Sequence, residues 1–218
     1  MTRGRFITFE GGEGAGKSTQ VSNLVQRLRA LELHVVQTRE PGGSPNAEAV
    51  REIVVNGPAD KWSPTAETLL MYAARADHLE HTIRPALARG EWVVCDRFAD
   101  STRAYQGTGG GVAPEVIEAI DAAVVGDDQP DLTLVFDLPV DVGLERAFGR
   151  DLFRARFESK GLEFHRRLRE RFRDIARENP DRCVLIDAAA APEAVAEAVW
   201  AAVSGRFPEL AGVRAAHG

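Results

Sequence analysis

The sequence is poor in several features that define particular classes of protein. It holds only two cysteines in 218 residues, Cys95 and Cys183, and both lie in apolar, strand-like runs. This pattern favours two buried free thiols over a disulfide. No run approaches the ~18 apolar residues of a membrane-spanning helix, and the first expected strand begins within five residues, so nothing resembles a signal peptide. We therefore expect a cytoplasmic protein with no membrane partner.

The chain also lacks the basic excess that is typical of nucleic-acid-binding proteins. It has 27 Lys and Arg against 33 Asp and Glu, a net charge of -6, which disfavours general binding to nucleic acid. The charge is unevenly distributed, because residues 142–182 hold eleven Arg and one Lys against eight Asp and Glu. This segment is either a solvated helix face or a site for something small and anionic.

One stretch carries a specific chemical signal. After an apolar run at residues 6–9, the chain fits the pattern G-x-x-x-x-G-K-[ST] and continues into a helix. The stretch comprises Gly11, Gly12, Glu13, Gly14, Ala15, Gly16, Lys17, Ser18 and Thr19. Glycines let backbone N–H groups surround an anion, and the following helix points its positive end at the same place. Lys17 adds a cation for the outer phosphates, and the Ser18 hydroxyl can hold Mg²⁺. A merely flexible turn is the weaker interpretation, so we predict that the protein binds a nucleoside triphosphate.

Strands and helices alternate along the chain, which predicts an α/β fold with a parallel sheet covered by helices on both faces. The expected strands are residues 6–9, 33–37, 92–95, 132–137 and 183–186. The expected helices follow the glycine-rich loop and then span about 46–55, 63–89, 100–106, 114–125, 140–148, 157–177 and 192–203. We expect one domain over residues 1–205 and a loose tail over 206–218.

Two of the expected strands end on a carboxylate. Phosphoryl transfer requires an Asp beside the phosphate loop to organise Mg²⁺. Asp96 is the better candidate, because Arg97 follows it directly and adds a cation for a second anion. Asp137 precedes Leu138 and Pro139 and is more typical of a turn at the end of a strand. No Asn/Thr-Lys-x-Asp motif of a guanine-specific switch follows any strand.

The basic segment and a histidine pair complete the candidates. Arg150, Arg154 and Arg156 fall between two expected helices, which fits a lid over about residues 149–158 that brings cations to the transferring group. A solvated helix junction is the alternative. His78 and His81 share a helix face, but no Cys or carboxylate cluster accompanies them, so we interpret them as surface or hydrogen-bonded histidines.

Several segments together resemble a known family. They are Gly11–Ser18, Thr38–Gly43, Tyr72–Arg75, Asp96–Phe98 and Ser101–Gly107, and over roughly residues 5–203 they are similar to bacterial thymidylate kinases. The resemblance implies the nucleoside monophosphate kinase fold, with a five-stranded parallel sheet, a lid and a homodimer. It further implies transfer of the γ-phosphoryl group of ATP to dTMP with Mg²⁺, giving dTDP.

The resemblance also implies roles for individual residues. Glu13 would accept from the sugar 3′-OH, Arg51 and Arg97 would clamp the dTMP phosphate, and Asp96 would act through Mg²⁺. Arg75 would donate to the base O4. The implied substrate-binding set is Glu13, Arg39, Arg51, Met71, Tyr72, Arg75, Arg97, Ser101, Thr102, Tyr105 and Gln106, with Tyr105 crowding out a 2′-OH. The implied catalytic set is Lys17, Arg97, Arg150, Arg154 and Arg156, and the implied metal ligands are Ser18 and Asp96.

The chain departs from the family pattern in three places. Ala15 stands where some members carry a catalytic arginine, so the lid arginines are expected to do that work. The usual aromatic residue four before Arg75 is Met71 here, with Tyr72 next, and either could cover the base. The lid usually has an Asp where this chain has Ala155. Two rival functions stay open: another small kinase of this fold acting on a deoxynucleoside or a different monophosphate, and an ATP-dependent switch or binding module.

Overall fold

The computed structural model describes residues 3–56, 58, 61–147 and 161–210. The predicted lid over 149–158, with Arg150, Arg154 and Arg156, lies outside the described residues. Among the helices of the described residues, none combines the length and apolar character required to cross a membrane.

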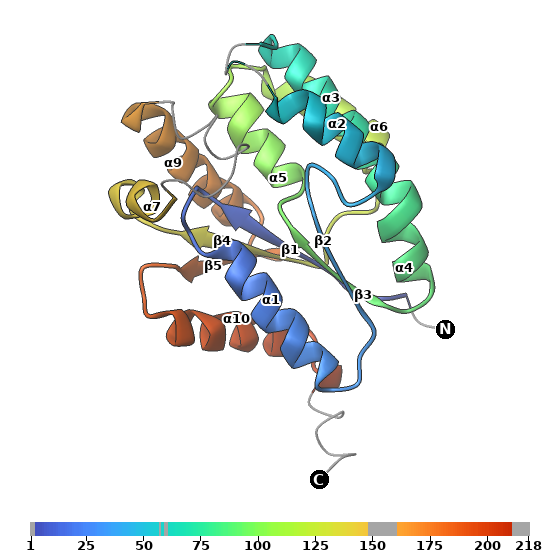
Figure 1. Ribbon diagram of the computed structural model, residues 1–218. Coiled ribbons are helices and arrows are strands. Elements are labelled where there is room, and N and C mark those ends of the chain that lie inside the picture. Colours follow the sequence, from blue (N-terminus) through green and yellow to red (C-terminus); the bar gives the residue numbers. More distant parts are fainter. Residues whose placement is uncertain (1–2, 57, 59–60, 148–160, 211–218) are drawn as a thin grey trace.

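A five-stranded parallel sheet forms the centre of the molecule (Figure 1). Its strands lie in the order β2-β3-β1-β4-β5, so the strand that leads into the phosphate loop is central. The strands are β1 (Phe6–Gly11), β2 (Val35–Arg39), β3 (Trp92–Asp96), β4 (Leu132–Asp137) and β5 (Cys183–Asp187). The predicted fold class is therefore confirmed. Because the strands are parallel, their carboxyl ends meet at one edge, where open α/β sheets bind ligands.

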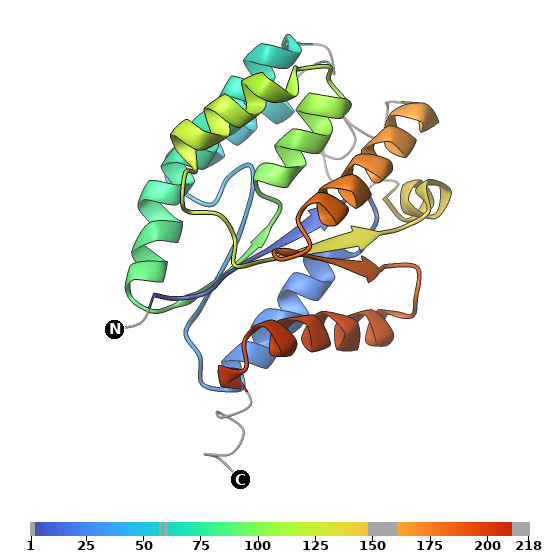
Figure 2. The same ribbon diagram turned by 180° about the vertical axis from the view of Figure 1, so that it is seen from behind.

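Helices cover both faces of this sheet, as the two opposite views show (Figures 1 and 2). One face is covered by α1 (Lys17–Arg29) and α10 (Pro192–Arg206). The other is covered by α2 (Pro45–Val55), α3 (Pro64–His78), α4 (Arg84–Ala88), α5 (Ala99–Thr102), α6 (Pro114–Val124) and α9 (Leu162–Glu178). The short helix α7 (Val140–Ala147) follows β4 at the ligand edge. Both cysteines are buried and free, as predicted.

The long helix expected over 63–89 is divided by a π-helical turn, η1 (Leu79–Ile83), immediately before α4. Pro85 lies in the first turn of α4. Proline has no N–H and its ring clashes with the preceding turn, so a wider turn at this place accommodates it. A second such turn, η2 (Arg103–Thr108), extends the short helix expected at 100–106.

Two expected boundaries were wrong. The strand placed at 33–37 begins two residues later and ends at Arg39, because its pairing with β3 runs from Val35 opposite Trp92 to Arg39 opposite Asp96. The expected loose tail does not begin at residue 206. Phe207 and Leu210 are 3% and 2% exposed and belong to the core beneath α1 and α10. Their apolar side chains bury there, so the fold continues to Leu210.

Candidate active site

The phosphate loop joins β1 to α1 and is shaped by close backbone approaches. Gly14 has a φ of 68°, and a Cβ at that position would lie 1.9 Å from the carbonyl oxygen of Gly143 in α7. Only glycine allows this contact. Lys17 Nζ donates to the carbonyl oxygens of Gly11 (2.9 Å) and Gly12 (2.7 Å), so its charge lies over the loop. The loop thus presents the first turn of α1 and a buried cation to an anion.

A groove of about 330 Å³ extends from this loop. One end is formed by loop residues from Gly14 to Gln20, and the other by Arg146, Ala188, Ala190, Pro192 and Val195. Arg146 Nη1 donates to the carbonyl oxygen of Ala188 at 3.3 Å, across the groove wall between α7 and the residues after β5. Sequence reasoning missed Arg146, because it was one of eleven arginines in a basic segment and no motif marked it.

Of the two carboxylates at strand ends, Asp96 faces the loop. Ser18 Oγ donates to Asp96 Oδ2 at 2.6 Å. The other oxygen, Oδ1, is buried and has no hydrogen-bond partner among the described residues. Burying an unpartnered carboxylate oxygen is costly, and a hard cation beside the Ser18 hydroxyl would satisfy it. These two residues therefore fit Mg²⁺, which takes oxygen ligands and is usually held by one or two carboxylates plus substrate phosphates.

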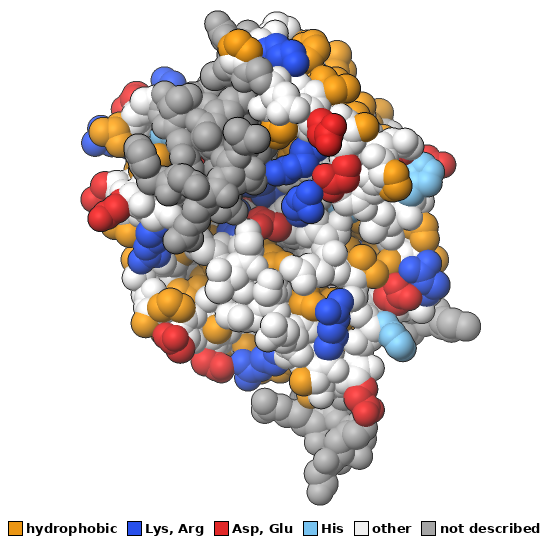
Figure 3. Space-filling view, viewed as in Figure 1, with side chains coloured by type: hydrophobic (Ala, Val, Ile, Leu, Met, Phe, Trp, Pro, Cys, Tyr) orange, Lys and Arg blue, Asp and Glu red, His pale blue; other side chains and the backbone are white. Residues whose placement is uncertain are grey.

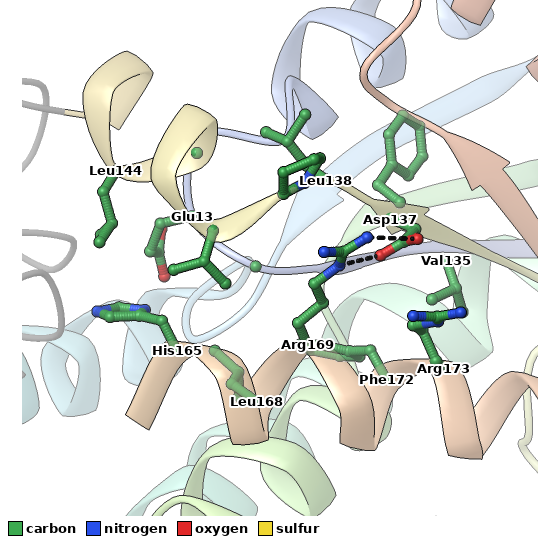
Figure 4. A pocket seen from close by; sticks show the side chains of 15 residues that line it. Glu13, Val135, Asp137, Leu138, Leu144, His165, Leu168, Arg169, Phe172 and Arg173 are labelled. Carbon is green, nitrogen blue, oxygen red and sulfur yellow. Dashed lines mark hydrogen bonds and ion pairs between the residues drawn. The ribbon is translucent and has the colours of Figure 1, made fainter. Parts of the chain in front are cut away.

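Asp137, in contrast, belongs to a structural ion pair. Its two oxygens accept from Arg169 Nε (2.6 Å) and Nη2 (3.0 Å) on α9, in a small pocket behind the loop (Figure 4). This bidentate pair ties β4 to α9 and occupies both carboxylate oxygens. This geometry agrees with the prediction that Asp96, and not Asp137, is the better candidate for a metal ligand.

The turn after β3 brings Arg97 against the phosphate loop. Arg97 has a φ of 72°, a left-handed conformation that is rare for residues other than glycine. Its Nη1 donates to the Gly11 carbonyl oxygen (3.1 Å) and its Nη2 to Glu13 Oε1 (3.0 Å). The Tyr105 hydroxyl donates to the same Glu13 oxygen at 2.6 Å, and burial raises the pKa of Tyr105 well above its ordinary value. The structure therefore brings together Glu13, Arg97 and Tyr105, three residues to which the family resemblance gave separate roles at the acceptor.

Glu10 is a further buried carboxylate that sequence reasoning missed. It accepts from the Phe98 N–H (2.7 Å), the Ser101 N–H (3.1 Å) and the Ser101 hydroxyl (2.6 Å). Glu10 therefore anchors the backbone that directly follows the left-handed residue Arg97. Burial, reinforced by repulsion from Asp100, raises the pKa of Glu10 to about 7. A charged residue inside an otherwise apolar strand was the available signal.

A second, narrower pocket of about 30 Å³ lies on the other side of Arg97. Apart from the glutamate and proline that begin the loop after β2, its walls come from α3 and from the segment that follows β3. The lining residues are Glu40, Pro41, Met71, Arg75, Arg97, Phe98, Ser101, Thr102, Tyr105 and Gln106. Seven of them were in the predicted substrate-binding set. Gln106 is oriented by a 2.8 Å bond from its Nε2 to Glu67 Oε1.

Arg75 is one of the charged residues that line this pocket and is 2% exposed. Its Nε donates to Glu40 Oε2 at 2.9 Å and its Nη2 to Thr102 Oγ1 at 3.0 Å. The remaining nitrogen, Nη1, is buried and has no partner among the described residues. Because Arg nitrogens only donate, the pocket requires a hydrogen-bond acceptor from a ligand at this point.

Met71 and Tyr72, the two candidates for covering the base, occupy different positions relative to the pocket. Met71 lines the pocket, whereas Tyr72 does not. The Tyr72 ring lies 4.6 Å from the Arg75 guanidinium carbon, and its hydroxyl donates to Asp121 at 3.0 Å. Tyr72 therefore supports Arg75, and the apolar walls beside Arg75 are Met71 and Phe98.

Besides Glu13 and Tyr72, two further predicted substrate residues do not line the pocket. Arg39 lies at the end of β2, is 53% exposed and pairs with Glu48 at 2.9 Å. Arg51 donates through Nη1 to the carbonyl oxygen of Pro41 at 3.0 Å, beside the pocket rather than within it. The family resemblance implied a place for both near the substrate, but sequence similarity does not fix which way a long side chain points.

His78, the last residue of α3, and His81, in η1, differ in environment. His81 is 56% exposed and lies 3.1 Å from an Asp77 oxygen. His78 is completely buried and joins Thr38 to Glu40. Both fit the hydrogen-bonded interpretation.

Comparison with known proteins places these features in one family. The sequence model of the family described as thymidylate kinase matches residues 9–199. The chain is 61% identical to the thymidylate kinase of Caulobacter vibrioides over 91% of this chain and 95% of that protein. It is 56% identical to the enzyme of Rhodopseudomonas palustris, over 94% and 91%. The crystal structure of thymidylate kinase from Ehrlichia chaffeensis superimposes with a TM-score of 0.70 at 36% identity, covering 84% of this chain and 93% of that one.

These matches span both the phosphate loop and the residues around Arg75, so they include the two pockets as well as the sheet. By sequence and by fold, the chain belongs to the thymidylate kinase family.

Proposed function

We propose that this protein transfers the γ-phosphoryl group of ATP to dTMP, giving dTDP and ADP. One observation carries the assignment: the buried, unpartnered Nη1 of Arg75 lies in a narrow pocket that shares Arg97 with the phosphate-loop region. Thymine presents the O4 acceptor that Nη1 requires, whereas cytosine presents an amino donor at that place. The pocket therefore favours a thymine or uracil nucleotide whose phosphate lies toward Arg97.

On the donor side, the phosphate loop binds the ATP phosphates, with Lys17 supplying charge at the transferring group. The groove between α7 and the residues after β5 is the space for the nucleoside, beside Arg146. Ser18 and Asp96 would hold Mg²⁺, which supplies charge neutralisation at the phosphate oxygens when bound. Direct in-line transfer needs no covalent enzyme intermediate.

On the acceptor side, Arg97 and Arg51 bind the dTMP phosphate. Glu13 accepts from the sugar 3′-OH, and the Tyr105 ring limits space at the 2′ position. Tyr105 and Glu13 are already joined by a 2.6 Å bond, so one ordered unit positions the sugar. Met71 and Phe98 supply the apolar walls for the base. Arg150, Arg154 or Arg156 supplies the cation that the phosphate loop lacks at Ala15.

A cytoplasmic homodimer is part of the proposal. In Figure 3 apolar side chains gather at the upper right of the face, over α2, α3 and α6. Exposed members on these helices are Ile53 (45%), Leu69 (53%) and Val116 (42%). Clusters of exposed apolar side chains on a soluble domain favour an interface. Sedimentation of the purified protein tests this, and a Leu69→Asp variant should shift it toward monomer.

The activity is tested by coupled ADP release with ATP–Mg²⁺ and each of dTMP, dUMP, dCMP, UMP and AMP. We expect dTMP first and dUMP weaker by roughly ten- to two-hundredfold, since a methyl group in an apolar pocket is worth only about 1–3 kcal/mol. We expect dCMP far behind. Preference for another monophosphate would favour a different kinase of this fold, and acceptor-independent slow hydrolysis would favour a switch.

A further inference from the structure

A buried chain of hydrogen bonds leads from Arg75 away from the substrate pocket. Glu40 Oε2 accepts from Arg75 Nε at 2.9 Å, and Glu40 Oε1 lies 3.0 Å from His78 Nδ1. The other ring nitrogen, Nε2, lies 2.7 Å from Thr38 Oγ1. This series of hydrogen bonds therefore connects the end of β2 with α3. His78 lines neither the groove beside the phosphate loop nor the pocket around Arg75.

The chemistry of this chain fixes where one proton lies. A carboxylate oxygen only accepts, so Nδ1 of His78 must carry the proton that joins it to Glu40. Both Glu40 oxygens then accept a hydrogen bond: Oε2 from Arg75 Nε and Oε1 from His78 Nδ1. The planar guanidinium of Arg75 is fixed by Glu40 through Nε and by Thr102 through Nη2. The direction of Nη1 is consequently fixed by the hydrogen bonds of Nε and Nη2, although the aliphatic part of the Arg75 side chain is flexible.

The loop after β2 closes tightly over this histidine. A Cβ on Gly43 would lie 2.4 Å from His78 Nε2 and 2.4 Å from Thr38 Oγ1. The Arg75, Glu40 and His78 side chains are at most 5% exposed. In such a place an unmade hydrogen bond is not replaced by bulk water, so loss of one member is transmitted to the next.

We propose that Glu40 and His78 are positioning residues that set acceptor selectivity by orienting Arg75. This inference rests on the proposed function, in which Arg75 meets the base. It assigns selectivity to groups that act through Arg75, and one of them, His78, does not line the pocket. Disturbing them should change the KM for dTMP and the ratio of dTMP to dCMP use, and should leave the KM for ATP unchanged.

Two isosteric replacements separate positioning from core filling. In His78→Asn the side-chain amide can occupy the place of Nδ1 and keep the donor to Glu40. In His78→Gln the amide reaches the place of Nε2, keeping contact with Thr38 and losing that donor. We expect His78→Asn to retain the wild-type selectivity within about threefold. We expect His78→Gln to lose at least tenfold in the dTMP to dCMP ratio of kcat/KM, mainly through KM. His81→Gln is the matched control on the exposed side of the same turn.

Equal behaviour of the two variants would overturn the positioning role, whether both keep the ratio or both lose it. Wild-type enzyme without any preference for dTMP over dCMP would instead contradict the proposed function. A measurement on the wild-type chain tests the geometry without activity or substitution. In a long-range ¹H–¹⁵N correlation spectrum of ¹⁵N-histidine-labelled protein, we expect the His78 proton on Nδ1. A ring protonated only at Nε2 would overturn the proposal even if both variants failed to fold.

Discussion

The groove beside the phosphate loop, which we assign to the phosphoryl donor, and the pocket around Arg75, which we assign to the acceptor, are formed by different parts of the chain. The donor groove is about 330 Å³ and is formed at its phosphate end by a glycine-rich loop. The acceptor pocket is about 30 Å³ and is lined by side chains, with Arg75, Arg97, Thr102 and Gln106 each at most 8% exposed.

The difference teaches where specificity resides in this protein. Backbone N–H groups and a helix terminus bind any phosphate, so they require only a shape that glycines supply. Distinguishing one base from another requires buried side-chain donors whose partners are missing when the wrong base enters. Changes on the donor side should therefore lower turnover without altering base preference. Changes on the acceptor side should alter preference without altering ATP binding.

The largest expected effect is on the donor side. Lys17→Ala should lower kcat by about a thousandfold or more, because a preorganised charge at the transferring group is lost. Binding of dTMP, measured by calorimetry, should stay within about threefold. Lys61→Ala, at an exposed site beyond α2, is the control. Near-wild-type turnover in folded Lys17→Ala protein would show that the loop is not the donor site.

The acceptor side is tested by Arg75→Ala. We expect kcat/KM for dTMP to fall several hundredfold and its advantage over dCMP to narrow, since the donor that we assign to O4 is removed. Arg84→Ala, at an exposed site on the next helix, serves as the control. Removing Arg75 leaves Glu40 buried without its cation, which is destabilising. The double variant Arg75→Ala with Glu40→Gln removes the unpaired charge, so any change in base preference that remains is not caused by a loss of stability. An unchanged preference for dTMP over dCMP in this double variant would contradict the assignment of base selectivity to the pocket around Arg75.

The lid arginines should have a smaller effect than Lys17. We expect at least one of Arg150→Ala, Arg154→Ala and Arg156→Ala to lower kcat on the order of a hundredfold, the scale of one lost electrostatic donor. Each should weaken dTMP binding less, because such a group acts mainly in the transition state. If all three retain full turnover, no lid arginine replaces the one absent at Ala15.

A further expected effect concerns stability and leaves the catalytic rate aside. Since burial raises the pKa of Glu10 from 4.5 to about 7, the folded state holds a proton that the unfolded chain has released in this range. The stabilisation is complete below about pH 4.5 and is lost as pH rises through 7. We expect wild-type protein to lose on the order of 3 kcal/mol relative to Glu10→Gln between pH 4.5 and 8. Denaturant unfolding at each pH measures this, with the exposed Glu193→Gln as control. Parallel pH curves for the wild-type protein and Glu10→Gln would contradict the shifted pKa.

Local sequence was sufficient for the features that depend on near neighbours. The phosphate loop, the bounds of β4 and the Asp96-Arg97 turn all follow from runs of adjacent residues with a defined chemistry. The same holds for Ser18, which a fixed spacing places opposite the strand-end carboxylate. These are contacts that short segments of backbone impose.

Buried polar partners could not be predicted in this way. Glu40 lies in the segment Thr38–Gly43 that resembles the family, yet its pairing with Arg75 and His78 depends on α3 packing against the loop after β2. Glu10 was visible only as one charge in an apolar strand. Arg39 shows the reverse case, a motif residue whose side chain pairs with Glu48 at the surface. Side-chain direction and distant partners decide these outcomes, and neither is local in sequence.

Arg97 combines an unfavourable backbone conformation with side-chain contacts that the site requires. A non-glycine residue in that conformation costs on the order of 1–3 kcal/mol, and glycine would adopt it freely. Glycine at position 97 would relieve this strain, but it would also leave Glu13 buried without its cation, which is destabilising. In this conformation the Arg97 guanidinium lines the acceptor pocket and donates hydrogen bonds to Gly11, Glu13 and Ser101 at once. Attempts to make this enzyme more heat-resistant should start elsewhere in the chain.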